Sequence, residues 1–213
     1  MILLVDGAER ARYPSEMSQM FGLRKKVFHD RLGWDVRIEN GMEIDAFDEL
    51  DPLYVLSVAP DTGRVTASLR LLPTTGPNML CDVFRELLAD GLVVRSATIW
   101  ESSRFCVDHE AFQDRSANRV ALAASELMCA VGEIGLSSGL THIVTVTDLL
   151  LERIFRRMEC PAERLGRPRR IGKVDAVAVH WEISSALLAR MKSAAGIGMP
   201  LTEHGRDLAP ARV

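Results

Sequence analysis

Apolar residues alternate with polar ones in some segments of the chain and recur every three or four residues in others. Alternation is clearest at 64–72, where apolar residues occupy every second position from Val65 to Leu71. By this criterion and by Val and Ile content, we expect six strands, at residues 1–4, 54–59, 64–72, 97–107, 142–147 and 173–183. Helical spacing predicts helices at about 15–32, 116–137, 148–158 and 184–194.

The order of these elements indicates an α/β fold. A helix, a run of strands, a long helix, a strand, a helix and a last strand favour a mixed sheet covered on both faces, a three-layer α-β-α sandwich. The order and length resemble the acetyltransferase-like (GNAT) fold, an analogy that proves no chemistry. We expect a single domain at 1–195 and a flexible tail at 196–213. The polar segment between Gly33 and Asp51 lacks periodicity and is predicted to be a functional loop.

Composition excludes several classes of protein. A formal charge of −3 predicts no general attraction to nucleic acid or to an anionic membrane. The first residues lack a basic signal-peptide region, and no window approaches the roughly 18–20 apolar residues of a membrane span, so we expect a cytoplasmic protein. The cysteines form no Cys-x-x-Cys pair, and no metal site is expected.

Charged residues on the strand at 97–107 are candidates for chemistry. Glu101 and Arg104 are three positions apart and would face opposite sides of a regular strand. Both can reach one cleft only if the strand has a bulge near Ser102 or Ser103. Backbone N–H groups freed by such a bulge could bind an oxyanion. An exposed glutamate and a buried arginine–aspartate pair explain the residues equally well.

Two aspartates and a helical pair precede that strand. Asp45 and Asp48 lie three apart in the polar loop, and a solvated acidic loop is the simpler interpretation when they are taken alone. The spacing of a calcium loop is missing. Arg24 and Phe28 are one helical turn apart and share a face, and Trp34 follows in the loop.

Taken together, these residues resemble the signature of the acyl-homoserine-lactone synthases, the bacterial autoinducer synthases. The matching positions are Arg24, Phe28, Trp34, Asp45, Asp48, Arg70, Phe84, Glu101 and Arg104. The surrounding segments LRKKVFHDRLGW, EIDAFDELDP, ASLRLLPTT and WESSRFCVD are also similar to the family, and the resemblance covers residues 1 to about 185. It implies a GNAT-like sheet with a split beside the fourth strand. It also implies synthesis of an N-acyl-homoserine lactone from S-adenosylmethionine and an acyl thioester.

The resemblance assigns roles to these residues. Glu101 is expected to be the general base, with Ser103 and Arg104 beside it in the catalytic group. Arg24, Asp45, Asp48, Arg70 and Arg104 are expected to form an ion-pair network that orders an N-terminal lid and binds S-adenosylmethionine. An aromatic face at Phe28 or Trp34 could stabilise the sulfonium. S-adenosylmethionine is a substrate here, so neither a cofactor nor a metal is required.

The acyl chain needs an apolar pocket beside the strands at 97–107 and 142–147. Candidates for its wall are Phe84, Trp100, Phe105, Met128, Thr145 and Leu149, with Met79, Leu122 and Phe155 as further possibilities. All are equally good core residues. The hydroxyl of Thr145 could bond a 3-oxo group.

The acyl donor is predicted from the start of the long helix. Acetyl-CoA-dependent relatives of the fold carry a glycine-rich pyrophosphate cradle there, whereas residues 115–120 read RSANRV. This favours an acyl carrier protein and leaves acyl-CoA open. Docking of such an acidic partner would use the basic residues Arg153, Arg156, Arg157, Arg169, Arg170 and Lys173, with Arg164 and Arg167 nearby. A merely solvated basic face is the alternative, and without interleaved aromatics nucleic acid is not expected.

Two other functions compete with lactone synthesis. A generic N-acetyltransferase would share the fold, but the missing glycine cradle and the complete set of nine residues disfavour it. A non-catalytic acyl or nucleotide sensor would be expected to lose Glu101 or the loop aspartates, and all are present.

Overall fold

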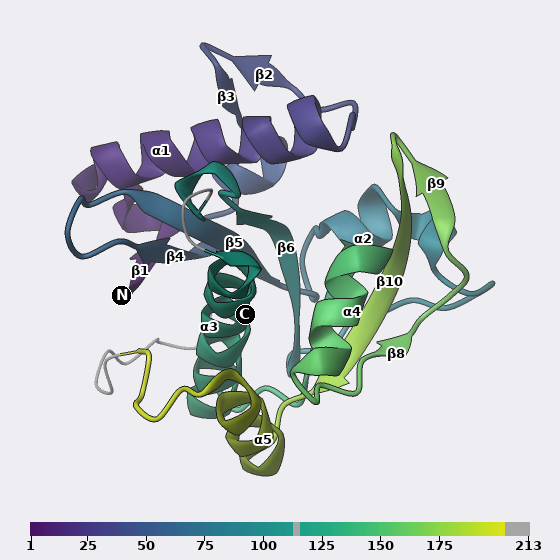
Figure 1. Cartoon of the computed structure of the whole chain (residues 1–213). Helices are drawn as coiled ribbons and strands as arrows, with labels where there is room; N and C mark the ends of the chain where they lie inside the picture. Colours follow the sequence, from purple (N-terminus) through teal and green to yellow (C-terminus); the bar gives the residue numbers. More distant parts are fainter. Residues whose placement is uncertain (113–115, 203–213) are drawn as a thin grey trace.

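A mixed β-sheet forms the middle of the molecule and has helices on both faces (Figure 1). The computed structural model describes residues 1–112 and 116–202, except for the side chains of 112–119. In spatial order the strands are β1 (Ile2–Asp6), β4 (Leu53–Val58), β5 (Val65–Pro73), β6 (Ile99–Val107), β7 (His142–Asp148), β10 (Val174–Glu182) and β8 (Glu163–Arg164), and β9 (Arg169–Ile171) also pairs with β10. β6 and β7 run parallel, and the other paired strands are antiparallel. The predicted α/β sandwich is confirmed.

Alternation and a high content of Val and Ile located the six longer strands. The six predicted strands match the observed ones to within two residues at each end. In β4, Val55 packs towards one helical layer and Tyr54 towards the other. The short strands β8 and β9 carry too few residues to produce a pattern.

The helices divide between the two faces of the sheet. α3 (Ser116–Ser137), α4 (Leu149–Arg157) and α5 (Ser185–Ala195) cover one face, which we call the α3 face. α1 (Pro14–Arg24) and the short α2 (Met79–Asp82) cover the other, the α1 face. Short 3-10 helices lie between these elements: η1 (Gly7–Arg12), η3 (Ala46–Glu49), η4 (Arg85–Leu87) and η5 (Glu110–Phe112).

The helix predicted over 15–32 changes its winding at Arg24. From there it continues as a π-helix, η2 (Lys25–Arg31), whose wider turns often occur at functional sites. The polar segment after it also contains more order than the sequence predicted. It forms a hairpin of β2 (Ile38–Glu39) and β3 (Met42–Glu43), followed by η3, because local turns and caps need no apolar periodicity.

The sheet splits beside β6, as expected from the resemblance. β6 and β7 pair from Ile99 opposite His142 as far as Ser102 opposite Thr145. Both strands continue beyond this point without further pairing to each other, so a gap opens between them.

Helix α3 contains an 18-residue window, Val120–Ser137, that is long and apolar enough to cross a membrane by length and composition. The expectation that no window approaches this limit is therefore wrong. In this structure 67% of the window is buried, as in the core helix of a globular domain.

The segment after α5 is attached to α3. The carboxylate of Glu133 accepts hydrogen bonds from the backbone N–H groups of Leu201 and Thr202 and pairs with Lys192 at 2.5 Å. Residues up to 202 are therefore held against the core. The remainder of the predicted tail, 203–213, lies outside the described residues.

Candidate active site

A β-bulge in β6 gathers the polar residues of this strand on one face. Arg104 and Phe105 together lie opposite the single residue Leu69 of β5. Arg104 has a φ of 55°, a left-handed value that costs an L-residue roughly 1–2 kcal/mol. The extra residue turns Arg104 onto the α1 face, which Glu101 and Ser103 already share. The bulge is thus present, one residue beyond its predicted position.

Arg104 is held by a carboxylate that the sequence did not single out. Glu43, fully buried in β3, accepts hydrogen bonds from Nε and Nη2 of Arg104 at 3.1 and 2.8 Å. It also accepts from Nε of Arg24 at 2.5 Å. Because it lies between two arginines, Glu43 connects the end of α1 to the bulge.

The two predicted aspartates complete this network. Asp48 accepts two hydrogen bonds from Arg24, at 2.7 and 2.9 Å, and one from Arg70 at 2.8 Å. Asp45 accepts two bonds from Arg70 and pairs with Arg104 at 2.9 Å. Three arginines and three carboxylates from α1, the polar segment, β5 and β6 therefore balance one another. We call Arg24, Glu43, Asp45, Asp48, Arg70 and Arg104 the ion-pair network.

Burial makes each charge in this network depend on its partners. Desolvation alone would raise the pKa of Asp48, but Arg24 and Arg70 outweigh it and hold that pKa well below its usual range. Desolvation would likewise lower the pKa of Arg24, and the carboxylates of Asp48 and Glu43 raise it instead. Tyr54 donates its hydroxyl to Asp48 at 2.9 Å, and burial beside that carboxylate raises the pKa of the phenol. A buried charge without its partner would be costly.

Glu101 lies next to the network but binds a different element. Its carboxylate accepts hydrogen bonds from the backbone N–H groups of Met79 and Leu80, at 2.9 and 2.5 Å, at the start of α2. Burial raises the pKa of Glu101, although these two hydrogen bonds oppose the shift. Each carboxylate oxygen keeps a second lone pair, so Glu101 can still accept a proton.

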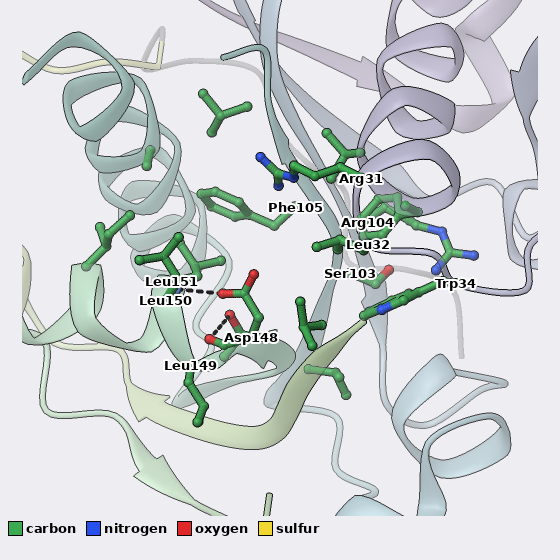
Figure 2. A pocket seen from close by; sticks show the side chains of 18 of the residues that line it. Arg31, Leu32, Trp34, Ser103, Arg104, Phe105, Asp148, Leu149, Leu150 and Leu151 are labelled. Atoms are coloured by element: carbon green, nitrogen blue, oxygen red, sulfur yellow. Dashed lines mark hydrogen bonds between the residues drawn. The ribbon is translucent and has the colours of Figure 1, made fainter. Parts of the chain in front are cut away.

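A cavity of about 620 Å³ occupies the split between β6 and β7. On the β6 side its wall contains Glu101, Ser103 and Arg104. On the β7 side it contains residues 146–148. Figure 2 shows the side chains of Leu149, Leu150 and Leu151 across the cavity from Trp34 and Ser103. Apolar side chains make up most of the wall. Its polar residues lie on both sides, with Glu101, Ser103 and Arg104 on β6 and Thr147, Asp148 and Arg153 on β7 and α4.

Three predicted aromatic residues form one side of this cavity. The ring of Trp34 lies 5.2 Å from that of Phe28 and 5.4 Å from that of Phe84. The guanidinium of Arg104 lies over Phe28, 5.0 Å from the ring centroid. The aromatic wall and the ion-pair network are therefore in direct contact.

The predicted acyl-pocket residues divide into two groups. Phe84, Phe105 and Leu149 line the cavity, as does Met79. The residues that do not line it are Trp100, Leu122, Met128, Thr145 and Phe155. Trp100 and Thr145 lie where β6 and β7 are still paired, and Met128 and Phe155 belong to the core on the α3 face. Apart from Glu101, the residues of β6 and β7 that line the cavity lie beyond the paired stretch.

The predicted docking arginines also differ in their contacts. Arg156 and Arg164 pair with Glu152, Arg170 pairs with Asp175, and Lys173 donates to the carbonyl of Asp30. For Arg153, Arg157 and Arg169 the described residues supply no ion-pair partner, and Arg153 lies at the cavity. The segment at 115–120 that bears on the acyl donor includes Arg115, which lies outside the described residues, as do the side chains up to 119.

Metal chemistry has no obvious donor set in this site. Within residues 1–112 and 116–202, no group of three or more His, Cys, Asp or Glu side chains is placed to hold a metal ion. The carboxylates near the cavity are instead occupied by arginines and backbone N–H groups.

Replacing Asp48 with Asn should destabilise the fold by roughly 3–5 kcal/mol at pH 7, because two buried guanidinium groups lose a charged partner. Urea denaturation measures this. The pKa of Asp48 is lowered in the folded state, so its contribution to stability is complete above about pH 4 and is lost as the pH falls further. The difference between the two proteins should therefore shrink in acid.

The exposed Glu49→Gln provides the matched control and should change stability by less than about 0.5 kcal/mol. Equal stability of Asp48→Asn and wild type at pH 7 would contradict a structural role for the network.

Comparison with known proteins places the site in a family. The autoinducer synthase family model matches residues 8–191. The chain is 44% identical over 177 residues to an acyl-homoserine-lactone synthase of Agrobacterium fabrum, covering 83% of each protein. It is similar to the crystal structure of the AHL synthase LasI, with a TM-score of 0.78, 30% identity and 95% and 98% of the two chains covered.

Another structure is of a CoA-dependent acyl-homoserine lactone synthase, BjaI, with SAM and isopentyl-CoA. It has a TM-score of 0.80 and 26% identity, with 93% of this chain and 90% of that chain covered. An acyl-CoA N-acyltransferase from Pseudomonas aeruginosa, at a TM-score of 0.52 and 12% identity, shares the fold alone. The family match, the split sheet and the polar residues around the cavity agree, and this chain belongs to the autoinducer synthase family of acyltransferases, the acyl-homoserine-lactone synthases.

Proposed function

We propose that this protein makes an N-acyl-L-homoserine lactone in the cytoplasm from S-adenosylmethionine and an acyl group carried on acyl carrier protein. The observation that carries the proposal is the cavity in the sheet split, whose wall is mostly apolar and carries Glu101, Ser103 and Arg104 on its β6 side. An acyl chain fits against the apolar part of the wall, and its thioester then lies beside these three residues.

The first step is acylation of the amine of S-adenosylmethionine. An α-amine ordinarily has a pKa of about 8 and is mostly protonated at neutral pH, so a base must remove a proton before it can attack. Glu101 takes this proton, directly or through a water, and its raised pKa suits the task. A C–N bond forms and the C–S bond of the thioester breaks. Nitrogen gives up two protons between the ammonium and the amide: one passes to the departing thiolate through Glu101, and the other is released to solvent.

The second step closes the lactone. The carboxylate of the acylated product attacks its own γ-carbon, and the C–S⁺ bond breaks with its electron pair moving to sulfur, which releases neutral methylthioadenosine. The sulfonium is already a good leaving group, so the protein mainly has to hold a folded conformation of the substrate. The ion-pair network and the aromatic wall of Phe28 and Trp34 hold the substrate beside the cavity, and the wall attracts its sulfonium.

The two candidate acyl donors present the same thioester and differ only in the carrier. An acidic carrier protein would find positive charge at Arg153 and Arg157 on α4 and at Arg169 on β9. Arg153 also lines the cavity. An acyl-CoA donor is the alternative, favoured by the relative whose crystal structure is described with isopentyl-CoA.

Purified protein incubated with S-adenosylmethionine and acyl donors of several chain lengths tests the function directly. Mass spectrometry should detect an N-acyl-homoserine lactone and an equal amount of methylthioadenosine. A well-folded protein that forms neither product from any acyl carrier protein or CoA thioester would contradict the proposal.

Glu101→Gln should lower kcat by about a hundredfold or more, because the proton acceptor is lost. The exposed Glu86→Gln, on the neighbouring η4, is the control and should keep full activity. Thermal unfolding of both variants separates lost chemistry from a loosened α2, since Glu101 also binds the start of that helix. Full activity of Glu101→Gln would exclude it as the base.

Charge reversal distinguishes the two donors. Arg157→Glu should reduce kcat/KM for acyl carrier protein by at least about tenfold and leave acyl-CoA within about twofold, because only the protein partner brings an extended acidic surface. Arg190→Glu on α5 makes the same charge change away from α4 and serves as control. Equal effects of Arg157→Glu on both donors would contradict carrier-protein docking at α4.

A further inference from the structure

Trp34 carries a buried hydrogen-bond donor that the fold does not use. Its side chain is 8% exposed, and its indole Nε1 has no hydrogen-bond partner among the described residues. A buried indole N–H usually has an acceptor. Trp34 also lines the cavity, so a ligand bound there is a candidate acceptor for this N–H.

The ring of Trp34 is held in one place. It is packed between Phe28 and Phe84, at centroid distances of 5.2 and 5.4 Å. Its backbone N–H donates to the carbonyl of Phe28 at 2.9 Å. Figure 2 shows the indole beside Ser103 and Arg104, at the end of the cavity away from Leu149–Leu151. The indole is therefore fixed beside Ser103 and Arg104.

Ser103 supplies a second donor at the same end. Its Oγ accepts a hydrogen bond from Nε of Arg70 at 3.1 Å, and a guanidinium can only donate. The hydroxyl proton of Ser103 is therefore available for a hydrogen bond to another group, and Ser103 lines the cavity. The guanidinium of Arg104, in contrast, is already engaged by Glu43 and Asp45.

The position of Glu101 decides which ligand atom these donors receive. Glu101 and Ser103 are two residues apart on β6 and share the α1 face, which separates their Cα atoms by roughly 6–7 Å. A carboxylate bound between them would face the negative charge of Glu101. A neutral carbonyl would have a base on one side and two donors on the other, the arrangement that addition to a carbonyl requires.

We propose that the indole N–H of Trp34 and the hydroxyl of Ser103 form the oxyanion-binding site of the acyl-transfer step. This rests on the proposed function. As the amine nitrogen bonds to the carbonyl carbon, the C=O π-electrons move onto oxygen, and the two donors bind the resulting oxyanion. When the intermediate collapses, C=O re-forms and the thiolate leaves. Trp34 is then a catalytic residue through its nitrogen, separately from any contact its ring makes with the sulfonium.

Trp34→Phe removes the N–H and keeps an aromatic ring in the wall. We expect kcat to fall by about 30-fold or more, with the KM for S-adenosylmethionine and the Kd of methylthioadenosine within about twofold of wild type. The control Trp181→Phe makes the same change in the core on the α3 face and should leave kcat within about twofold. An unchanged kcat, or a loss confined to nucleoside binding, would overturn the proposal.

A binding measurement tests the contact without relying on turnover. The three tryptophans of the chain give separate indole N–H signals by NMR after ¹⁵N labelling. Two donor analogues are compared on the carrier that the enzyme prefers: a ketone that keeps the carbonyl and replaces sulfur by CH₂, and a thioether that lacks the carbonyl. The ketone should move the Trp34 signal downfield, and the thioether should not.

Equal Trp34 shifts with the two analogues would overturn the oxyanion site and leave the proposed function intact. If neither analogue perturbed any cavity residue, the failure would instead be that of the proposed function, since no acyl donor would then bind in the sheet split.

Discussion

The candidate active site depends on a buried network of ion pairs between three arginines and three carboxylates. The partners come from α1, the polar segment, β5 and β6, so the network fixes the N-terminal segment against the sheet. Buried ion pairs are weak evidence for net stability, because desolvation offsets much of their attraction. Their effect here is positional: this placement of α1, β3 and β6 pairs every charge of the network.

The bulge in β6 and the split in the sheet belong to the same constraint. Arg104 adopts a left-handed backbone conformation, and the network gives its guanidinium the partners that hold it there. Its side chain thereby reaches the α1 face together with Glu101 and Ser103. The pairing of β6 with β7 ends just before this point, and the cavity opens there. One irregular residue therefore links the charge network to the cavity.

Much of this could be predicted from the sequence. Alternation and helical spacing located six strands and four helices, because strands and helices buried on a sheet impose clear periods. Arg24, Asp45, Asp48, Arg70 and Arg104 were identified only jointly, through a family resemblance, and the structure brings all five together. Their individual spacings were compatible with a solvated loop.

Other features had no sequence signal or a weak one. Glu43 was grouped with an exposed acidic loop, yet three arginines and two aspartates leave one buried positive charge unbalanced, and that count pointed to a third acid. The boundary of the cavity depends on where β6 and β7 separate, which no local pattern encodes, so Trp100, Met128 and Thr145 were expected at a wall they do not form.

Hydrogen exchange of Glu43→Gln against wild type is the most direct measurement of the central claim. If the network fixes the N-terminal segment on the sheet, amides at 20–34 and 42–48 should lose at least about ten times more protection than amides of β7 and β10. Unchanged protection at 20–48, or an equal loss across the whole sheet, would contradict the account.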